Sequence, residues 1–330
     1  MPNVSVCIPT YNREDLLPSA IESVIQQTYP DWELIVCDDG SCDRTAEIMT
    51  QYQEQDNRIR YIRHPQNIGK SNNMRSGFDA AIGAYFIKFD DDDRLTPEFL
   101  AKTVAILDQY PQVDFVGTDH WLINIQNQRD QEATKLNSRY WGRENRPEGI
   151  IENLLEVVFV KQVFQIGATL FRRQALIDVN YMRPNLQNCE DNDLLVRLAL
   201  DQKTGYYLPE YLMEYRIHGG QEGNERAIRY LEDKASYLDY FNFESEKLEK
   251  IRRSRLGAVQ LNLGLRLIEI GQETKGRNAL EAAKANIGTS RKAQFGFLLS
   301  YCPLKLRQWI FQTIRKIRSP DYAAQMRQAK

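Results

Sequence analysis

Residues 4–13 read VSVCIPTYNR, and this short apolar run, followed at once by a polar cluster, decides the fold. The pattern returns at 34–41, LIVCDDGS, and at 85–93, YFIKFDDDD. Apolar runs of this length, separated by amphipathic stretches such as 17–25, predict buried strands that alternate with helices. Strands and helices in alternation form a mainly parallel sheet with helices on both faces. We therefore predict an α/β fold for the first part of the chain.

Polar residues follow each of these three apolar runs. They lie at 9–13, 38–41 and 90–93, directly after the expected strands. In a parallel α/β sheet, ligands bind beyond the carboxyl ends of the strands. The sequence therefore predicts one binding site to which all three clusters contribute.

The composition is that of an ordinary globular protein. The 330 residues are 42% hydrophobic and 27% charged, which excludes a disordered chain, a collagen and a coiled-coil rod. No run approaches the roughly 18 apolar residues that span a bilayer, and the start lacks the pattern of a signal peptide. The five cysteines are scattered along the chain, which is typical of reduced thiols. We therefore expect a cytoplasmic protein.

Charge divides the chain into two parts. Residues 245–330 carry 18 lysines and arginines against 6 aspartates and glutamates, which leaves 25 basic and 39 acidic residues in the rest of the chain. From about Arg226 onward the pattern is continuously helical. We therefore predict an α/β domain over 1–222 and a basic α-helical region over 223–330.

Four consecutive aspartates, Asp90 to Asp93, follow the strand expected at 85–89. Side chains alternate in direction along an extended segment, so Asp90 and Asp92 are expected to point the same way. Two carboxylates on one side suit a hard divalent ion such as Mg²⁺ or Mn²⁺, which takes its other ligands from water and phosphate. The alternative is an acidic surface loop, which the crowding of like charges disfavours.

Other candidate groups each have a plainer alternative. The 9–13 cluster offers hydroxyls, an amide, an aromatic ring and a guanidinium for a base and a diphosphate, or it is an ordinary polar loop. Asp39 is a candidate to accept hydrogen bonds from a nucleobase or a ribose, or to make a turn. Asp191 is a candidate general base at a helix start, or it complements the helix dipole. His218 is a candidate metal ligand or a simple loop histidine.

Short motifs occur in a fixed order along the chain. They are VSVCIPTYNR at 4–13, LIVCDDGS at 34–41, NIGKS at 67–71, FDDDD at 89–93, EDNDLLVR at 190–197 and YRIH at 215–218. Together they resemble the family 2 glycosyltransferases, which are inverting enzymes with the GT-A fold, a Rossmann-like, mainly parallel sheet. The resemblance covers roughly residues 2–220. It implies a GT-A catalytic domain over 1–222, followed by the helical region.

The resemblance implies a role for each matching position. Asp191 matches the general base that takes the proton of the acceptor hydroxyl. Asp92 matches the direct ligand of a divalent ion, Mn²⁺ or Mg²⁺, with Asp90 closer to the ribose or the metal's waters and His218 assisting at the metal or diphosphate. Arg75 departs from the family, where many relatives carry a small or amide residue. The implied donor-binding residues are Pro9, Thr10, Tyr11, Arg13, Asp39, Lys70, Asp90 and Asp91.

The implied reaction moves a single sugar from a nucleotide-diphosphate sugar, with a UDP- or dTDP-sugar favoured, to an acceptor hydroxyl with inversion. The implied acceptor is a glycan, a lipid-linked molecule or another hydroxyl, in the synthesis of cell-surface polysaccharide or glycans. The Q-x-x-R-W motif of processive synthases is absent, which favours transfer of one sugar at a time. Two alternatives stay open: a binding protein without turnover that docks a partner through its helical tail, and a nucleotidyltransferase, although 9–13 lacks the glycine-rich loop of that class.

The C-terminal segment mixes basic residues with large apolar ones. The basic residues are Lys305, Arg307, Arg315, Lys316 and Arg318, and the apolar ones are Leu304, Leu306, Trp309, Ile310, Phe311, Ile314 and Ile317. A basic helix with Trp and Phe is typical of a segment that lies on an anionic membrane surface. This predicts peripheral contact with the inner face of the membrane. The alternative is a packed helix with a cationic exposed side, and no nucleic-acid partner is expected.

Overall fold

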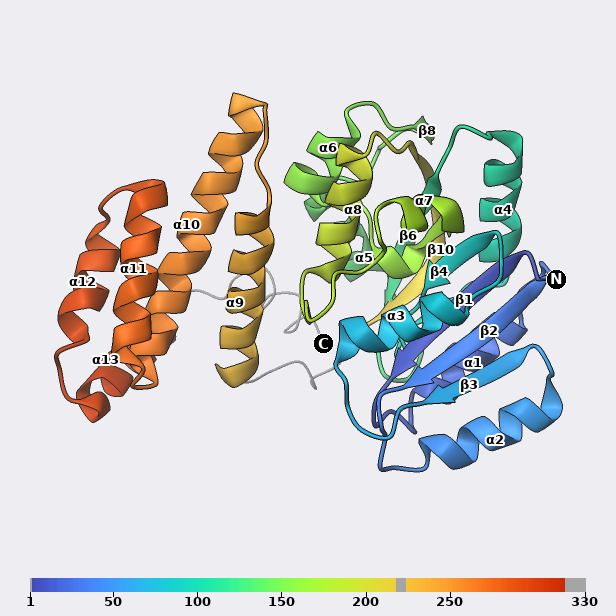
Figure 1. Ribbon diagram of the computed structural model, residues 1–330, viewed down its shortest axis with the longest axis horizontal. Coiled ribbons are helices and arrows are strands. Elements are labelled where there is room, and N and C mark those ends of the chain that lie inside the picture. The colour runs from blue at the N-terminus through green and yellow to red at the C-terminus, as the bar shows by residue number, and fades with distance from the viewer. Residues whose placement is uncertain (1, 218–223, 318–330) are drawn as a thin grey trace. The chain divides into compact units, whose positions relative to one another are not determined.

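The computed structural model describes residues 2–217 and 224–317 (Figure 1). The chain forms two compact units that divide after residue 218. The first unit is an α/β domain and the second is built from helices. The functional division into domains 1–222 and 223–330 stays a prediction.

The first unit is built on one sheet of ten strands in the order β3-β2-β1-β4-β9-β6-β10-β5, with β7 beside β6 and β8 beside β10. The strands are β1 (Val4–Thr10), β2 (Trp32–Asp38), β3 (Ile59–Arg63), β4 (Tyr85–Lys88), β5 (Arg94–Leu95), β6 (Phe115–Ile123), β7 (Arg129–Asp130), β8 (Gly149–Ile150), β9 (Thr169–Arg172) and β10 (Gly205–Arg216). The strands that the apolar runs predicted, β1, β2 and β4, are neighbours in its centre.

Most strands of the sheet run in one direction. β3, β2, β1 and β4 are parallel, and the register sets Thr10 beside Asp38. β9 is antiparallel to both β4 and β6, so β6 and its parallel neighbour β10 run with β1. The carboxyl ends of β1, β2, β4, β6 and β10 therefore meet at one edge, where ligands bind in such sheets.

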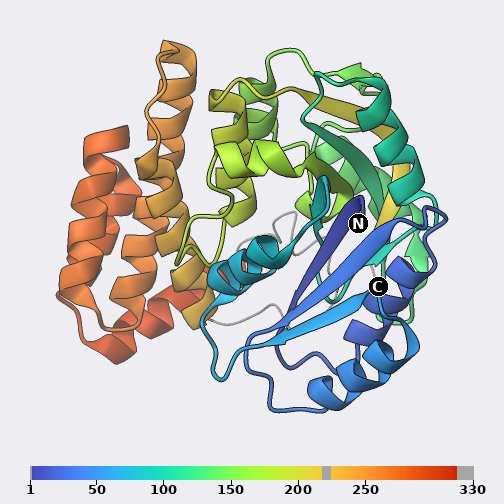
Figure 2. The same cartoon turned by 45° about the vertical axis from the view of Figure 1, so that its right-hand side comes forward.

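Helices cover both faces of this sheet, as the sequence predicted. The helices are α1 (Leu17–Ile25), α2 (Thr45–Gln55), α3 (Lys70–Ala80), α4 (Phe99–Gln109), α5 (Gln131–Tyr140), α6 (Leu154–Glu156), α7 (Arg173–Asp178) and α8 (Glu190–Leu200). The apolar sides of α1 and α4 join Val4, Val6 and Ile8 in one buried core. Because side chains alternate along a strand, Cys7 points to the opposite face, where α3 crosses β1 and β2 (Figures 1 and 2).

A glycine allows α3 to pack closely on the sheet. A Cβ atom at Gly77 would lie 2.3 Å from Sγ of Cys7 and 2.6 Å from Sγ of Cys37, so any larger residue collides with β1 and β2. This close approach carries the N-terminus of α3, at Lys70, to the edge where the strands end.

Two element ends are set by particular hydrogen bonds. α4 begins at Phe99, two residues after Pro97, whose carbonyl accepts a hydrogen bond from the backbone N–H of Thr28. β9 is preceded by a short 3₁₀ turn, Ile166–Ala168, in which the side chain of Gln165 accepts from the backbone N–H of Ala168.

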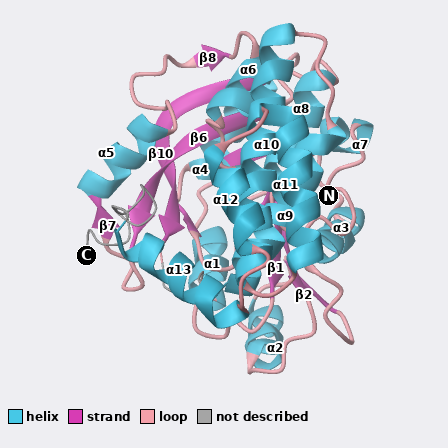
Figure 3. Ribbon diagram, turned by 90° about the vertical axis from the view of Figure 1, so that its left-hand side faces the viewer, coloured by secondary structure: helices cyan, strands magenta, loops and turns pink. Residues whose placement is uncertain are grey.

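The second unit is helical, as predicted (Figure 3). Its helices are α9 (Asn224–Tyr240), α10 (Glu246–Glu269), α11 (Glu273–Ile287), α12 (Arg291–Leu299) and α13 (Leu304–Ile317). α10 and α11 pack closely because Gly264 has no side chain. A Cβ atom at this position would lie only 2.8 Å from the carbonyl oxygen of Gly276. Leu261, Leu265 and Leu280 are buried between them. Within the two described stretches, no helix has the length and apolar character needed to cross a bilayer.

Candidate functional site

The loop after β1 is joined to the loop after β2. Asn12 adopts a left-handed conformation at φ 52°, and its backbone N–H donates to Oγ of Ser41 at 2.9 Å. Its side-chain oxygen accepts from the backbone N–H of Cys42 at 2.8 Å. Tyr11 is exposed beside it, whereas Pro9 and Thr10 are buried within β1. Two of the three predicted polar clusters therefore form one surface.

Asp39 binds the backbone of the NIGKS motif. Its two carboxylate oxygens accept from the N–H of Ile68 at 2.6 Å and of Gly69 at 3.1 Å. Burial raises the pKa of Asp39, and these two N–H groups oppose the rise. The structure thus gives Asp39 a positioning role toward the loop before α3, and its predicted contact with a base edge stays a prediction.

The four aspartates after β4 form a turn and do not continue the strand. The backbone N–H of Asp93 approaches the carbonyl of Asp90 at 3.4 Å. The extended geometry assumed for this segment was therefore wrong. The turn nevertheless leaves Asp90 and Asp92 partly exposed and buries Asp91 and Asp93.

Negative charge accumulates in this turn. Burial and the neighbouring Asp92 raise the pKa of Asp91 to about 7. The same two causes, burial first, raise the pKa of Asp93 well above its usual range. Arg13 lies nearby, with its Nε atom 3.9 Å from Oδ1 of Asp91. Carboxylates gathered in this way at the edge of the sheet are suited to bind a cation.

Two lysines approach the same turn from different elements. Lys88, the last residue of β4, is only 1% exposed and its ammonium lies 2.8 Å from Oδ2 of Asp90. Lys70 lies 3.9 Å from Oδ1 of Asp90 and 2.8 Å from Oε1 of Glu190. Burial alone would raise the pKa of Asp90, but Lys88 and Lys70 together lower it to about 2. Asp90 is therefore held in its ionised form.

Asp191 lies in the first turn of α8, close enough to this cluster to interact electrostatically with Lys88 and Asp90. Its Oδ1 atom is buried and has no hydrogen-bond partner. Burial raises the pKa of Asp191 to about 6, against the lowering effect of Lys88, and Glu190 adds to the rise. A carboxylate with a free oxygen and a pKa near the working pH is suited to accept a proton.

Arg75 holds the segment that leads to Asp191. Its Nη1 atom donates to the carbonyls of Met182 at 2.7 Å and Asn180 at 2.9 Å. Farther along, Oε1 of Gln187 accepts from the backbone N–H of Lys70 at 2.7 Å. The departure from the family pattern at Arg75 thus has a local structural role.

The residues fit a divalent ion that is completed by substrate. Among residues 2–217 and 224–317, no group of three or more His, Cys, Asp or Glu side chains could hold a metal by itself. Mg²⁺ is commonly held by one or two carboxylates together with substrate phosphates. Oδ2 of Asp93 is buried without a hydrogen-bond partner, and the turn offers the hard oxygen ligands that such ions prefer. His218, the third predicted metal ligand, lies outside the described residues.

Sequence reasoning missed several residues that shape the site. Lys88 was visible as one charged residue in the apolar strand YFIKF. Glu190 stood next to Asp191 but received no role of its own, and it pairs with Lys70. Arg216 donates from Nε to the carbonyl of Asp92 and from its backbone N–H to Oδ1 of Asp93, so the end of β10 holds the aspartate turn. No sequence signal indicated that contact.

Comparisons with known proteins identify the class. The family model "Glycosyl transferase family 2" matches residues 5–178, more than half of the chain. An uncharacterised glycosyltransferase of Haemophilus influenzae is 28% identical over 249 residues, 72% of this chain and 74% of the relative. The Campylobacter jejuni GalNAc(5)-diNAcBac-PP-undecaprenol beta-1,3-glucosyltransferase is 42% identical over 97 residues, 29% of this chain and 31% of that relative, so the chain spans less than a third of its length.

Solved structures share the fold at low sequence identity. S. aureus TarS 1–349 in complex with UDP-GlcNAc superposes with a TM-score of 0.61 at 17% identity, covering 95% of this chain and 92% of that one. The mannosyltransferase PcManGT from Pyrobaculum calidifontis, in complex with GDP-Man and Mn²⁺, has a TM-score of 0.58 at 16% identity, covering 95% and 85%.

The fold and these relatives define a glycosyltransferase with a GT-A sheet. The chain belongs to glycosyl transferase family 2.

Proposed function

We propose that this family member transfers a single sugar, with inversion, from a nucleotide-diphosphate sugar to an acceptor hydroxyl in the cytoplasm. The observation that carries the proposal is Oδ1 of Asp191, a buried carboxylate oxygen without a hydrogen-bond partner at the edge where the strands end. A binding protein needs no such group, whereas a direct displacement needs one base.

The described residues divide the chemical work. Asp191 accepts the proton of the attacking hydroxyl, and the ammonium groups of Lys88 and Lys70 keep the neighbouring Asp90 ionised. Attack from the side opposite the departing diphosphate inverts the anomeric carbon. One base is enough for this step, in contrast to the paired nucleophile and acid of retaining glycosidases.

A divalent ion, Mn²⁺ or Mg²⁺, belongs at the aspartate turn. Asp92 and Asp90 would hold it together with the diphosphate of the donor, and His218 is a further candidate ligand. When bound, it supplies charge neutralisation for the departing nucleoside diphosphate. Support for this assignment comes from the oxygen-rich turn and from the Mn²⁺ in the PcManGT complex.

We propose that the donor binds at the surface formed by the loops after β1 and β2, which Asn12 connects. Pro9, Thr10, Tyr11 and Arg13 would line it, and Asp39 would contact the base. We favour a UDP- or dTDP-sugar as donor. The acceptor is proposed to be a glycan or a lipid-linked molecule of cell-surface polysaccharide synthesis, which agrees with the undecaprenol-linked acceptor in the name of the C. jejuni relative.

The decisive experiment is calorimetric titration of the purified chain with UDP, dTDP and GDP, each with Mn²⁺ and with EDTA. Metal-dependent binding of one nucleotide is expected. Asp92→Ala should weaken that binding in Mn²⁺, while Asp79→Ala, on the exposed side of α3, should leave it unchanged. Equal affinity of the Asp92 variant and the wild type would remove Asp92 from the metal site.

Turnover separates the transferase from a protein that only binds. With the nucleotide known, release of that nucleotide from its sugars is measured in the presence of glycan and lipid-linked acceptors. Asp191→Asn should abolish release yet bind nucleotide as tightly as the wild type. Parallel loss of nucleotide binding would argue against a role as base, and wild-type binding without any turnover would favour the binding protein that docks a partner.

A further inference from the structure

The helical unit exposes an unusual amount of apolar surface at one place. The three most exposed large hydrophobic side chains of the described residues are Tyr301 at 70%, Leu298 at 69% and Trp309 at 64%. All three lie on α12, on α13 or in the turn between them. Leu304 and Leu306 are also exposed there. Apolar side chains gathered in this way mark a contact surface.

The inward sides of these helices already have their partners. Arg307 is buried and pairs with Glu273, and it donates to the carbonyl of Ile268 at 3.2 Å. At about 100° per residue, Lys305 and Trp309 each lie about 200° from Arg307, so both point away from the core of this unit. Lys305 and Trp309 are therefore left over after packing and do not belong to the core of this unit.

The charge of this segment has one sign. From residue 282 to residue 320 the sequence contains no aspartate or glutamate. Arg291 and Lys305 are exposed within it, whereas the ammonium of Lys292 donates to Oδ1 of Asn262 on α10 at 2.9 Å. Aromatic and aliphatic side chains in a segment that carries only cations match the boundary of an anionic bilayer, where headgroups attract the cations and acyl chains receive the apolar groups.

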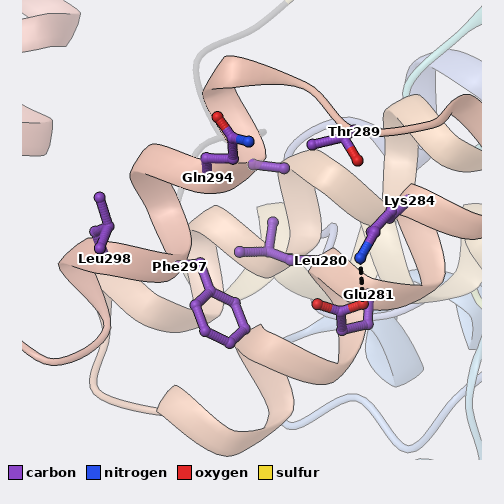
Figure 4. Close-up of a pocket in the computed structure, with 8 residues that line it drawn as sticks. Leu280, Glu281, Lys284, Thr289, Gln294, Phe297 and Leu298 are labelled. Carbon is purple, nitrogen blue, oxygen red and sulfur yellow. Dashed lines mark ion pairs between the residues drawn. The ribbon is translucent and has the colours of Figure 1, made fainter.

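A hollow adjoins this surface between α11 and α12. Its volume is about 410 Å³, and Leu280, Phe297 and Leu298 contribute its apolar lining. Figure 4 shows Lys284 and Glu281 at one side of it, joined by an ion pair of 3.7 Å. The apolar area beside Leu298 is therefore concave. The acyl chains of a bilayer are flexible enough to fill such a hollow.

We propose that the α12–α13 face, defined as Phe295, Leu298, Tyr301, Leu306 and Trp309 with Arg291 and Lys305, binds peripherally to a bilayer of anionic phospholipid. The face belongs wholly to the helical unit. The inference goes beyond sugar transfer and does not depend on it, because it rests on exposure, packing and charge within the helical unit alone.

The test is co-sedimentation of the full chain with lipid vesicles. We expect binding to vesicles of phosphatidylglycerol and phosphatidylcholine in equal parts, and little binding to phosphatidylcholine alone. Added salt should weaken the binding because it screens the charges. Failure to bind the anionic vesicles overturns the proposal, and equal binding to both kinds of vesicle removes the role assigned to the cations.

Paired variants assign the binding to this face. Leu306→Ser with Trp309→Ser should lower the partition at least tenfold, and Arg291→Gln with Lys305→Gln should lower it about thirtyfold, as two cations at an anionic surface would. The control is Ile125→Ser, which removes a side chain exposed to 60% in the first unit. Circular dichroism checks that each variant folds.

Two outcomes of the variant series would refute the assignment. Unchanged partition of the Leu306/Trp309 variant, with its fold intact, would show that another surface binds lipid. The other outcome is that the wild type self-associates and does not bind vesicles, and that the Leu306/Trp309 variant is monomeric. That result would assign the face to a second copy of the chain.

Discussion

Replacing Lys88 by methionine tests whether the buried lysine stabilises the aspartate turn. The side chain of Lys88 is 1% exposed and that of Asp90 24%, with the two charges 2.8 Å apart. The lysines lower the pKa of Asp90 from 3.8 to about 2. A shift of this size corresponds to about 2 kcal/mol of folding free energy at pH 7. Lys88→Met should lose most of it, since Lys70 is farther from Asp90, at 3.9 Å.

The pH dependence of this loss has a definite sign. The pKa of Asp90 is lower in the folded protein than in the unfolded chain, so the stabilisation is complete above the unfolded value of about 3.9. It disappears as the pH falls from there toward about 2. The part of the difference between Lys88→Met and the wild type that comes from Asp90 should therefore be constant from pH 8 to about pH 5 and should shrink below that.

The assay is a double-mutant cycle of Lys88→Met and Asp90→Asn, measured by urea unfolding. Three of the four tryptophans, Trp32, Trp121 and Trp141, lie in the first unit, so tryptophan fluorescence reports mainly on its unfolding. We expect a coupling energy of about 2 kcal/mol. The control is the more exposed pair of Lys102 and Glu210, where about 0.2–1 kcal/mol is typical. A Lys88–Asp90 coupling no larger than that of the control would refute the reasoning.

Further predictions concern the base, the α3 contact and the segment before α8. Transfer should fall about tenfold per pH unit below about pH 6, because Asp191, with its pKa raised to about 6 mainly by burial, must be ionised to accept a proton; a flat rate between pH 5 and 7 would exclude it as the base. Gly77→Val should lower the free energy of unfolding by about 1–3 kcal/mol through overpacking against Cys7 and Cys37, whereas Asp79→Ala on the same helix should change it by less than about 0.5 kcal/mol. Arg75→Ala leaves two carbonyls without their donor and should speed amide hydrogen exchange over 180–189; unchanged exchange there would mean that Gln187 alone holds the segment.

The strands at the centre of the sheet were predictable because they are buried on both faces. Such strands form continuous apolar runs, as in VSVCI and LIVC. The polar residues at their ends stood out because each cluster directly follows one of these apolar runs. Element ends were less predictable, since contacts such as that of Pro97 with Thr28 join distant parts of the chain.

The sequence by itself determined the alternation of strands and helices, the run of four aspartates and the division between an acidic body and a basic helical tail, because each is a local pattern of residue types. Only the tertiary structure decided that Lys88 and Lys70 meet at Asp90, from β4 and from the start of α3. It also decided that Arg216, the last residue of β10, holds the aspartate turn although more than 120 positions of the sequence separate them. These contacts depend on which strands, far apart in the sequence, pair in the sheet. A local pattern of residue types does not show which strands will be neighbours.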